Sequence, residues 1–157
     1  MPQIFRAVAY VPPAEAGTAF DLAVLPHDER RVRRRLITLV HGDQVLVDFP
    51  QPVTLEDRSA LRLEDGRLAE IIAGEEWLYD VRGRDPAHLL RLAWHLGNRH
   101  LKAQVEADRL LILRDHVIRT MLLGLGATVT EISEPFHPEE GAYAHAHAEP
   151  AHALLNR

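Results

Sequence analysis

The 157-residue sequence predicts an α+β protein made of a small N-terminal β-barrel or sandwich and a C-terminal ferredoxin-like βαββαβ domain. Two observations predict this class, and a third predicts a tail after the folded part. The first half contains short runs rich in valine, isoleucine, leucine and phenylalanine, separated by turn residues. In the second half the spacing of the apolar residues changes, because segments with helical spacing alternate with strands. From Glu134 onward proline, glycine, glutamate, histidine and alanine dominate, which indicates a mobile tail.

In the first half, strands are expected at residues 5–11, 36–40, 44–49 and 67–72. The turn residues between them lie at 41–43, 50–52 and 64–66, and their glycines, prolines and aspartates fit β-hairpins. Such spacing without a convincing helix favours a β domain ending near Gly74. The predicted division is therefore residues 1–74, residues 75–142 and a flexible, histidine-containing tail at 143–157.

The second half is expected to begin with a strand at residues 77–81. Asp85 should cap a first helix, with Pro86 at its first position. An apolar stripe on this helix is formed by Leu89, Leu92, Ala93 and Leu96. The opposite, polar face is expected to carry His88, Arg91 and His95. Gly97 and Asn98 should end the helix.

Strands at residues 102–106 and 110–113 follow, and a second helix starts after Asp115. This helix is expected to bury Val117, Ile118, Met121 and Leu122 and to end at residues 124–126. A last strand at 128–132 completes the order β-α-β-β-α-β, which is the ferredoxin-like arrangement.

Composition excludes several classes of protein. The net charge of −5 argues against a protein that mainly coats DNA or an anionic membrane. No signal-like stretch opens the chain, and no apolar run approaches the ~20 residues that span a bilayer, so we expect a cytoplasmic protein without membrane partners. The absence of cysteine rules out disulfides and thiolate metal sites. Any metal must be held by histidine nitrogen and oxygen ligands.

Ten histidines remain as candidate ligands, and four of them lie from His137 onward. His88 and His95 are about 10 Å apart along their helix, too far to chelate one ion together. His116 is either a metal ligand or a polar residue of the second helix's first turn, and the polar interpretation is favoured. His100 follows a helix end, where the fold fixes its position, and two copies in a symmetric dimer would form a preformed pair.

The tail contains three further imidazoles, at His145, His147 and His152. The first two are close enough in a flexible chain to form a small chelate. Imidazole suits zinc, copper and nickel better than calcium or magnesium. Because only neutral imidazole binds a metal, binding should weaken as the pH falls through about 6.5.

Two other classes of function are less well supported. The chain has no H-E-x-x-H helix, glycine-rich phosphate loop or G-x-S-x-G elbow, so we do not expect an enzyme. The arginine-rich run from Arg30 to Arg35 could contact phosphates of a nucleic acid. It lacks interleaved aromatic residues, however, and a solvated edge strand is the preferred interpretation, so no nucleic-acid partner is expected.

Residues 95–100 read HLGNRH, which resembles the signature of the UreE family of urease accessory proteins, the nickel metallochaperones. Residues 25–30 and the arginine-rich run after them resemble the family's first-domain motif. Residues 115–117 fit the start of its second helix, and PFHPEEGAY at 135–143 is similar to its PFxPExGAY segment. The resemblance therefore spans nearly the whole chain.

This resemblance implies an N-terminal domain similar to a peptide-binding module, which docks protein partners, and a ferredoxin-like domain that dimerises and binds metal. It implies that His100 binds nickel at the dimer interface, with delivery to the urease apoprotein together with a GTPase and other accessory proteins. Lys102 stands where many members have proline. Arg114 stands where some have histidine, which weakens a secondary site near His116. Residue chemistry alone leaves a zinc- or copper-binding protein or storage module as the alternative.

Overall fold

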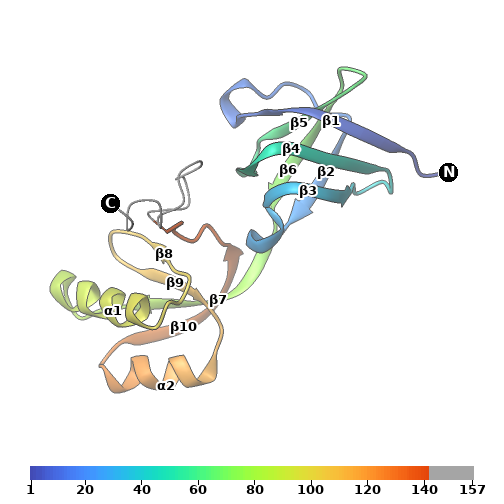
Figure 1. Cartoon of the computed structure of the whole chain (residues 1–157). Coiled ribbons are helices and arrows are strands. Elements are labelled where there is room, and N and C mark those ends of the chain that lie inside the picture. The colour runs from blue at the N-terminus through green and yellow to red at the C-terminus, as the bar shows by residue number, and fades with distance from the viewer. Residues whose placement is uncertain (142–157) are drawn as a thin grey trace, which may run out of the picture.

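The computed structural model describes residues 1–141 and contains two folded bodies joined at β7 (Figure 1). The first is a curled β-sheet. The second combines a four-stranded sheet with two helices. The α+β class and both architectures predicted from the sequence are confirmed. The predictions for residues 143–157 lie outside the described residues.

The N-terminal body is a six-stranded sheet of order β2-β6-β5-β1-β4-β3. Its strands are β1 Ile4–Val11, β2 Asp21–Leu25, β3 Arg31–Thr38, β4 Gln44–Thr54, β5 Ala60–Leu63 and β6 Leu68–Ala73. Short 3-10 turns, η1 Pro13–Glu15 and η2 His27–Glu29, precede β2 and β3. The amide of Val40 donates to the carbonyl of Leu22, so the end of β3 meets β2 and the sheet curls around its core. That core is made largely of buried aliphatic side chains, including Val45, Leu55, Leu61, Leu63 and Ile71.

One predicted turn in this body is wrong. Residues 50–52 belong to β4, which runs on to Thr54. Proline is tolerated there because the pairing of β4 with β3 shifts register between Val32 and Arg34. The parallel pairing of β1 with β4 also ends at Leu46, so this stretch has no ladder with β1 to interrupt. The short strands β2 and β5 are additional to those the sequence pattern predicts.

The C-terminal body has the ferredoxin-like topology, with sheet order β10-β7-β9-β8 and every pair antiparallel. Its elements are β7 Glu75–Arg82, α1 Pro86–Asn98, β8 Gln104–Val105, β9 Leu110–Leu113, α2 His116–Gly124 and β10 Thr128–Pro135. Both helices have the predicted aspartate caps, since Asp85 accepts from the amide of His88 and Asp115 accepts from those of Val117 and Ile118. One sheet face packs on the helices around Leu92, Leu96 and Leu122.

Part of the opposite face of this sheet is covered by the segment that follows β10. Phe136 is fully buried against Leu78 and Leu111. The amide of His137 donates to Gln104 Oε1, and the amide of Glu139 donates to the carbonyl of Ala103. Because residues 134–141 are strand or make these contacts, the prediction of a tail starting at Glu134 is wrong.

Two side-chain predictions are also corrected. His88 is buried, with 6% of its surface exposed, rather than on the polar face of α1. Val117 is 55% exposed rather than buried, because Ile118 and Leu122 form the inward face of α2. Neither α1 nor α2 has the length and apolar character to cross a membrane, and within residues 1–141 no other helix does.

Candidate metal centre

The C-terminus of α1 places His100 in an unusual backbone conformation. Arg99 caps the helix, and the amide of His100 donates to the carbonyl of Gly97. The amide of Leu101 donates to the carbonyl of Leu96, which completes the paired hydrogen bonds of a Schellman motif. This motif needs a left-handed residue, and His100 has φ +58°. Glycine is the usual choice here because a Cβ atom is strained in this region.

Helix α2 ends with the same motif and offers an internal comparison. The amide of Gly126 donates to the carbonyl of Leu123, and the amide of Ala127 donates to that of Leu122. Gly126 has φ +85°, so glycine occupies the position that histidine occupies after α1. The left-handed conformation at His100 therefore costs about 1 kcal/mol relative to glycine. Arg58, with φ +67°, also has a left-handed backbone, so the conformation by itself makes His100 a candidate functional residue and no more.

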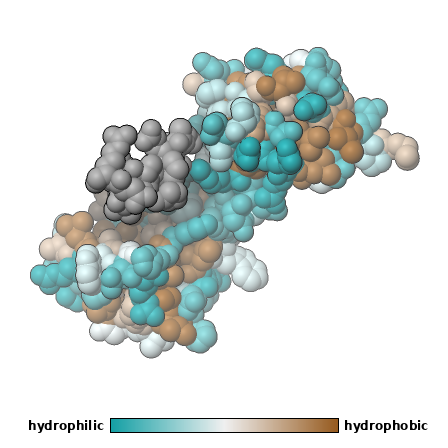
Figure 2. Space-filling model, in the orientation of Figure 1, coloured by the Kyte–Doolittle hydropathy of each residue, from teal (hydrophilic) through white to brown (hydrophobic). Residues whose placement is uncertain are grey.

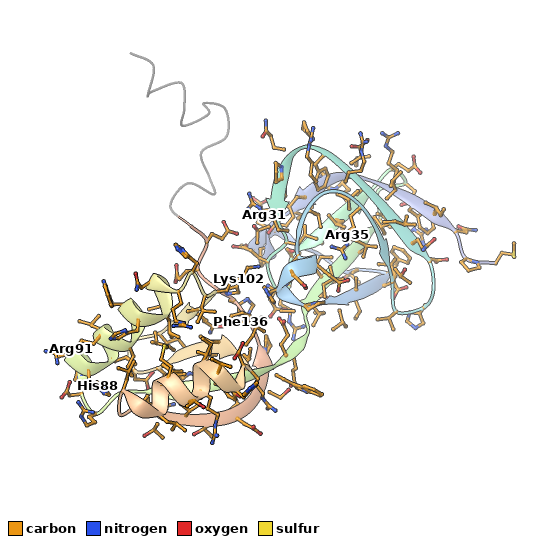
Figure 3. All side chains as sticks on the ribbon, turned by 60° about the horizontal axis from the view of Figure 1, so that its bottom comes forward. Arg31, Arg35, His88, Arg91, Lys102 and Phe136 are labelled. Carbon is orange, nitrogen blue, oxygen red and sulfur yellow. The ribbon has the colours of Figure 1, made fainter. Side chains whose placement is uncertain are left out.

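The imidazole of His100 is exposed and lies beside two hollows. The larger, of about 890 Å³, lies between the two bodies and is lined by His27, Arg31 and Lys102 as well as by residues 138–141. Figure 3 shows Arg31 and Lys102 on the two bodies where they meet, with Phe136 close by. The smaller, of about 330 Å³, lies toward the start of α2 and includes Asp115. His100 is thus accessible to an ion and to a second protein surface.

Within residues 1–141, no three histidine or carboxylate side chains lie together in a geometry that holds a metal. His95 is half-buried on α1, with its ring 5.1 Å from that of Trp94. His116 is exposed at the first position of α2. Within the described residues, none of the three candidates His95, His100 and His116 therefore belongs to a group of three ligands that could hold a metal. His145, His147 and His152 lie outside the described residues.

His88 is a structural residue. Its Nδ1 accepts from the amide of Arg84 at 3.0 Å, which fixes the proton on Nε2. That nitrogen donates to the carbonyl of Leu125 at 2.8 Å and links α1 to the end of α2. Both ring nitrogens are occupied, so His88 has no lone pair for a metal. Figure 3 shows it far along α1 from the junction between the bodies.

The arginine-rich run mainly serves the fold. Its strand, β3, lies at the edge of the sheet, as predicted. Arg34 pairs with Asp48 and Arg35 with Glu29, at 3.3 and 2.8 Å. Arg30 is only 4% exposed and bonds to the second body, which the sequence does not reveal. These contacts favour the structural interpretation of the run over phosphate binding.

At the junction between the bodies, His27 makes contacts that the sequence does not predict. His27 Nδ1 lies 2.8 Å from Glu76 Oε1, and the His27 amide donates to Glu76 Oε2. The ring of His27 also meets that of Phe136 edge to face, 5.0 Å between centroids. Its partners lie 49 and 109 positions along the chain, so only the fold brings them together.

Comparison with known proteins identifies the family. The family model for the N-terminal domain of the UreE urease accessory protein matches residues 3–74, and the model for its C-terminal domain matches residues 76–155. The chain belongs to the UreE family of urease accessory proteins. The resemblance carried by the HLGNRH sequence is thereby confirmed.

Several relatives support this membership. The urease accessory protein UreE of Mesorhizobium japonicum is 60% identical over 144 residues, which cover 90% of this chain and 74% of that protein. Urease accessory protein UreE 1 of Brucella suis is 53% identical over 146 residues, or 92% of this chain and 90% of that protein. UreE of Rhizobium rhizogenes is 52% identical over 151 residues, with coverage of 94% and 88%.

Proposed function

We propose that this chain is a nickel-binding metallochaperone that delivers Ni(II) to the urease apoprotein during urease maturation. The observation that carries the proposal is the exposed imidazole of His100 in a left-handed position where the neighbouring helix uses glycine. Membership of the urease accessory family supports a role for that imidazole in urease maturation. The protein then acts as a carrier that holds an ion for transfer, rather than as an enzyme that converts a substrate.

One imidazole is too few ligands for a transition metal, so the site needs a second copy of the chain. In a homodimer with His100 near the twofold axis, the two imidazoles form the core of a shared site. The same helix that ends at His100 carries two large exposed apolar side chains, Leu90 at 73% and Trp94 at 64%. Apolar patches interrupt the polar surface of both bodies (Figure 2), and such residues on α1 suit a dimer contact.

Further ligands are proposed from the tail. His145 and His147 are spaced to close a chelate and His152 follows, so these residues can complete the shared site. His95 and His116 remain secondary candidates. Imidazole ligands also suit Zn(II) and Cu(II), so the choice of nickel rests on the family. The proposed partners are the urease apoprotein and other urease accessory proteins, including a GTPase, in the cytoplasm.

Activation of purified urease apoprotein tests this function. Nickel-loaded protein is added to the apoprotein with the other accessory proteins, in the presence of a chelator that removes free nickel. The wild-type chain should produce active urease, and His100→Ala should produce much less. Equal activation by both proteins would refute the delivery role of His100. Equal activation by wild-type chain loaded with zinc would refute the assignment of nickel.

A further inference from the structure

His27 uses only one of its two ring nitrogens to join the bodies. Its Nδ1 lies 2.8 Å from Glu76 Oε1. Because a carboxylate accepts hydrogen bonds, Nδ1 carries the proton and Nε2 keeps its lone pair. Within residues 1–141 no hydrogen bond reaches Nε2. His88 differs in this respect, since both of its ring nitrogens are bonded.

The unbonded nitrogen of His27 is accessible, although only 9% of the side chain is exposed. Among the described residues, Arg30 Nε is the one buried side-chain nitrogen or oxygen atom that lacks a hydrogen-bond partner. His27 Nε2 has no partner and is not buried in that sense, so solvent reaches it. The space beside it is the hollow of about 890 Å³ between the bodies, which His27 lines.

Three contacts fix the direction of the His27 ring. Glu76 accepts from the ring through Oε1 and from the His27 amide through Oε2. The ring also packs edge to face on Phe136. Imidazoles that bind metals commonly donate their second nitrogen to a carboxylate, which sets the tautomer and makes the ligand nitrogen more basic. The pair of His27 and Glu76 has this arrangement.

Other donors line the same hollow. They are the imidazole of His100 and the carboxylates of Asp28 and Glu139. Both carboxylates belong to exposed residues, and no hydrogen bond or ion pair within the described part of the chain engages either of them. No three of these side chains enclose an ion as they stand. Exposed carboxylates can turn toward an ion at small cost, however, and water can complete its coordination.

Two cationic side chains at the hollow, Arg31 and Lys102, oppose the binding of a metal ion. Arg31 Nη1 lies 3.7 Å from Glu140 Oε2, which offsets its charge. Lys102 is exposed and makes no ion pair within residues 1–141, so its ammonium repels a divalent ion. Any ion held here is therefore bound weakly, as suits an ion that is to be passed on.

We propose that this hollow is a second metal-binding site, in which His27 Nε2 is the fixed ligand for a divalent transition-metal ion. Asp28 and Glu139 supply oxygen ligands, and Glu76 orients the imidazole. The inference extends the proposed function and rests on it for the choice of nickel. It gives an ion that enters or leaves His100 a second, weaker site in the same hollow, on the first body.

Imidazole ¹⁵N NMR during titration with Zn(II) alone tests the site in the full-length protein, because zinc is diamagnetic. His145, His147 and His152 are replaced by alanine so that they cannot compete for the ion. Beyond saturation of the tight site, Zn(II) should shift the resonance of His27 Nε2. His41 is the matched control: its Nδ1 also lies 2.8 Å from a carboxylate of the first body, Asp21, but it does not line the hollow. An unmoved His27 Nε2, or equal shifts at His27 and His41, would overturn the inference.

Calorimetry of variants in the same background gives the second test. His27→Gln should lose the weaker zinc ion, Glu76→Gln should bind it about tenfold more weakly, and His41→Gln should bind like the parent protein. A weaker ion retained by His27→Gln would contradict the assignment; if that variant does not fold, the NMR titration decides. His100→Ala separates the two proposals. A tight site that survives there refutes the proposed function, whereas a lost tight site with His27 Nε2 unmoved in the parent refutes only this inference.

Discussion

Replacing His100 by glycine should stabilise the metal-free protein while removing its imidazole. An L-residue in the left-handed region costs about 1 to 2 kcal/mol, which glycine does not incur. Glycine loses about 0.5 to 1 kcal/mol through its greater freedom in the unfolded chain. The net gain for φ +58° is therefore roughly 0.5 to 1 kcal/mol. For a chain of this length that corresponds to a rise in Tm of about 2 °C.

The alanine variant distinguishes the effect of backbone strain on stability from the effect of losing the imidazole. His100→Ala keeps a Cβ atom in the same conformation, so its stability should stay within about 0.5 kcal/mol of wild type. Gly126→Ala, at the equivalent position after α2, is the reciprocal control. It should destabilise the protein by about 1 kcal/mol or more, since the new Cβ also meets the mobile end of the Arg84 side chain.

Urea and thermal unfolding with a chelator, at one protein concentration, measure these differences. The expected order of stability is His100→Gly above wild type and His100→Ala, with Gly126→Ala lowest. Both His100 variants should lose the tight nickel site. A glycine variant less stable than the alanine variant would show that the left-handed backbone is not strained, and the argument that His100 is kept for its chemistry would fail.

Three further predictions concern the tail and two other histidines. Ending the chain after Ala142 should weaken nickel binding and lower the number of ions bound without abolishing the His100 site; unchanged calorimetric affinity and stoichiometry would leave the tail without a role. His88→Ala should cost about 2 to 3 kcal/mol in urea unfolding, because it strands the buried carbonyl of Leu125, yet leave nickel affinity unchanged; lost affinity with intact stability would instead make His88 a ligand. Burial, and then the charge of Arg30, lower the pKa of His137. The unfolded chain therefore takes up a proton first, and stability should fall as the pH drops below about 6.5, less steeply in His137→Gln; equal slopes in urea unfolding of the two proteins would contradict this.

The predictions that succeeded rest on local rules. Asp85 with Pro86, and Asp115, are helix-start signals that need no tertiary partner, and both helices begin there. The apolar stripe of Leu89, Leu92 and Leu96 likewise identifies the buried face of α1 from spacing alone. The order of the second body follows once these elements are placed.

The failures involve partners distant in the sequence. A histidine on the polar side of a helix looks exposed until the carbonyl of Leu125 supplies its partner. A segment rich in proline and glutamate looks mobile until Leu78 and Leu111 enclose Phe136 and Arg30 meets its carbonyl. The left-handed backbone of His100 could not be predicted from the sequence either, because glycine is the residue that normally indicates this conformation at a helix end.

In the proposed arrangement, two His100 imidazoles in a homodimer form the tight nickel site. This arrangement is tested by calorimetric titration of wild type and His100→Ala with nickel, with the mass of each protein in solution measured in the same buffer. We predict a dimer in both proteins, one tight nickel ion per dimer in wild type, and loss of that site in the variant. A wild-type monomer, or unchanged tight binding in His100→Ala, would exclude a nickel site shared by two His100 imidazoles.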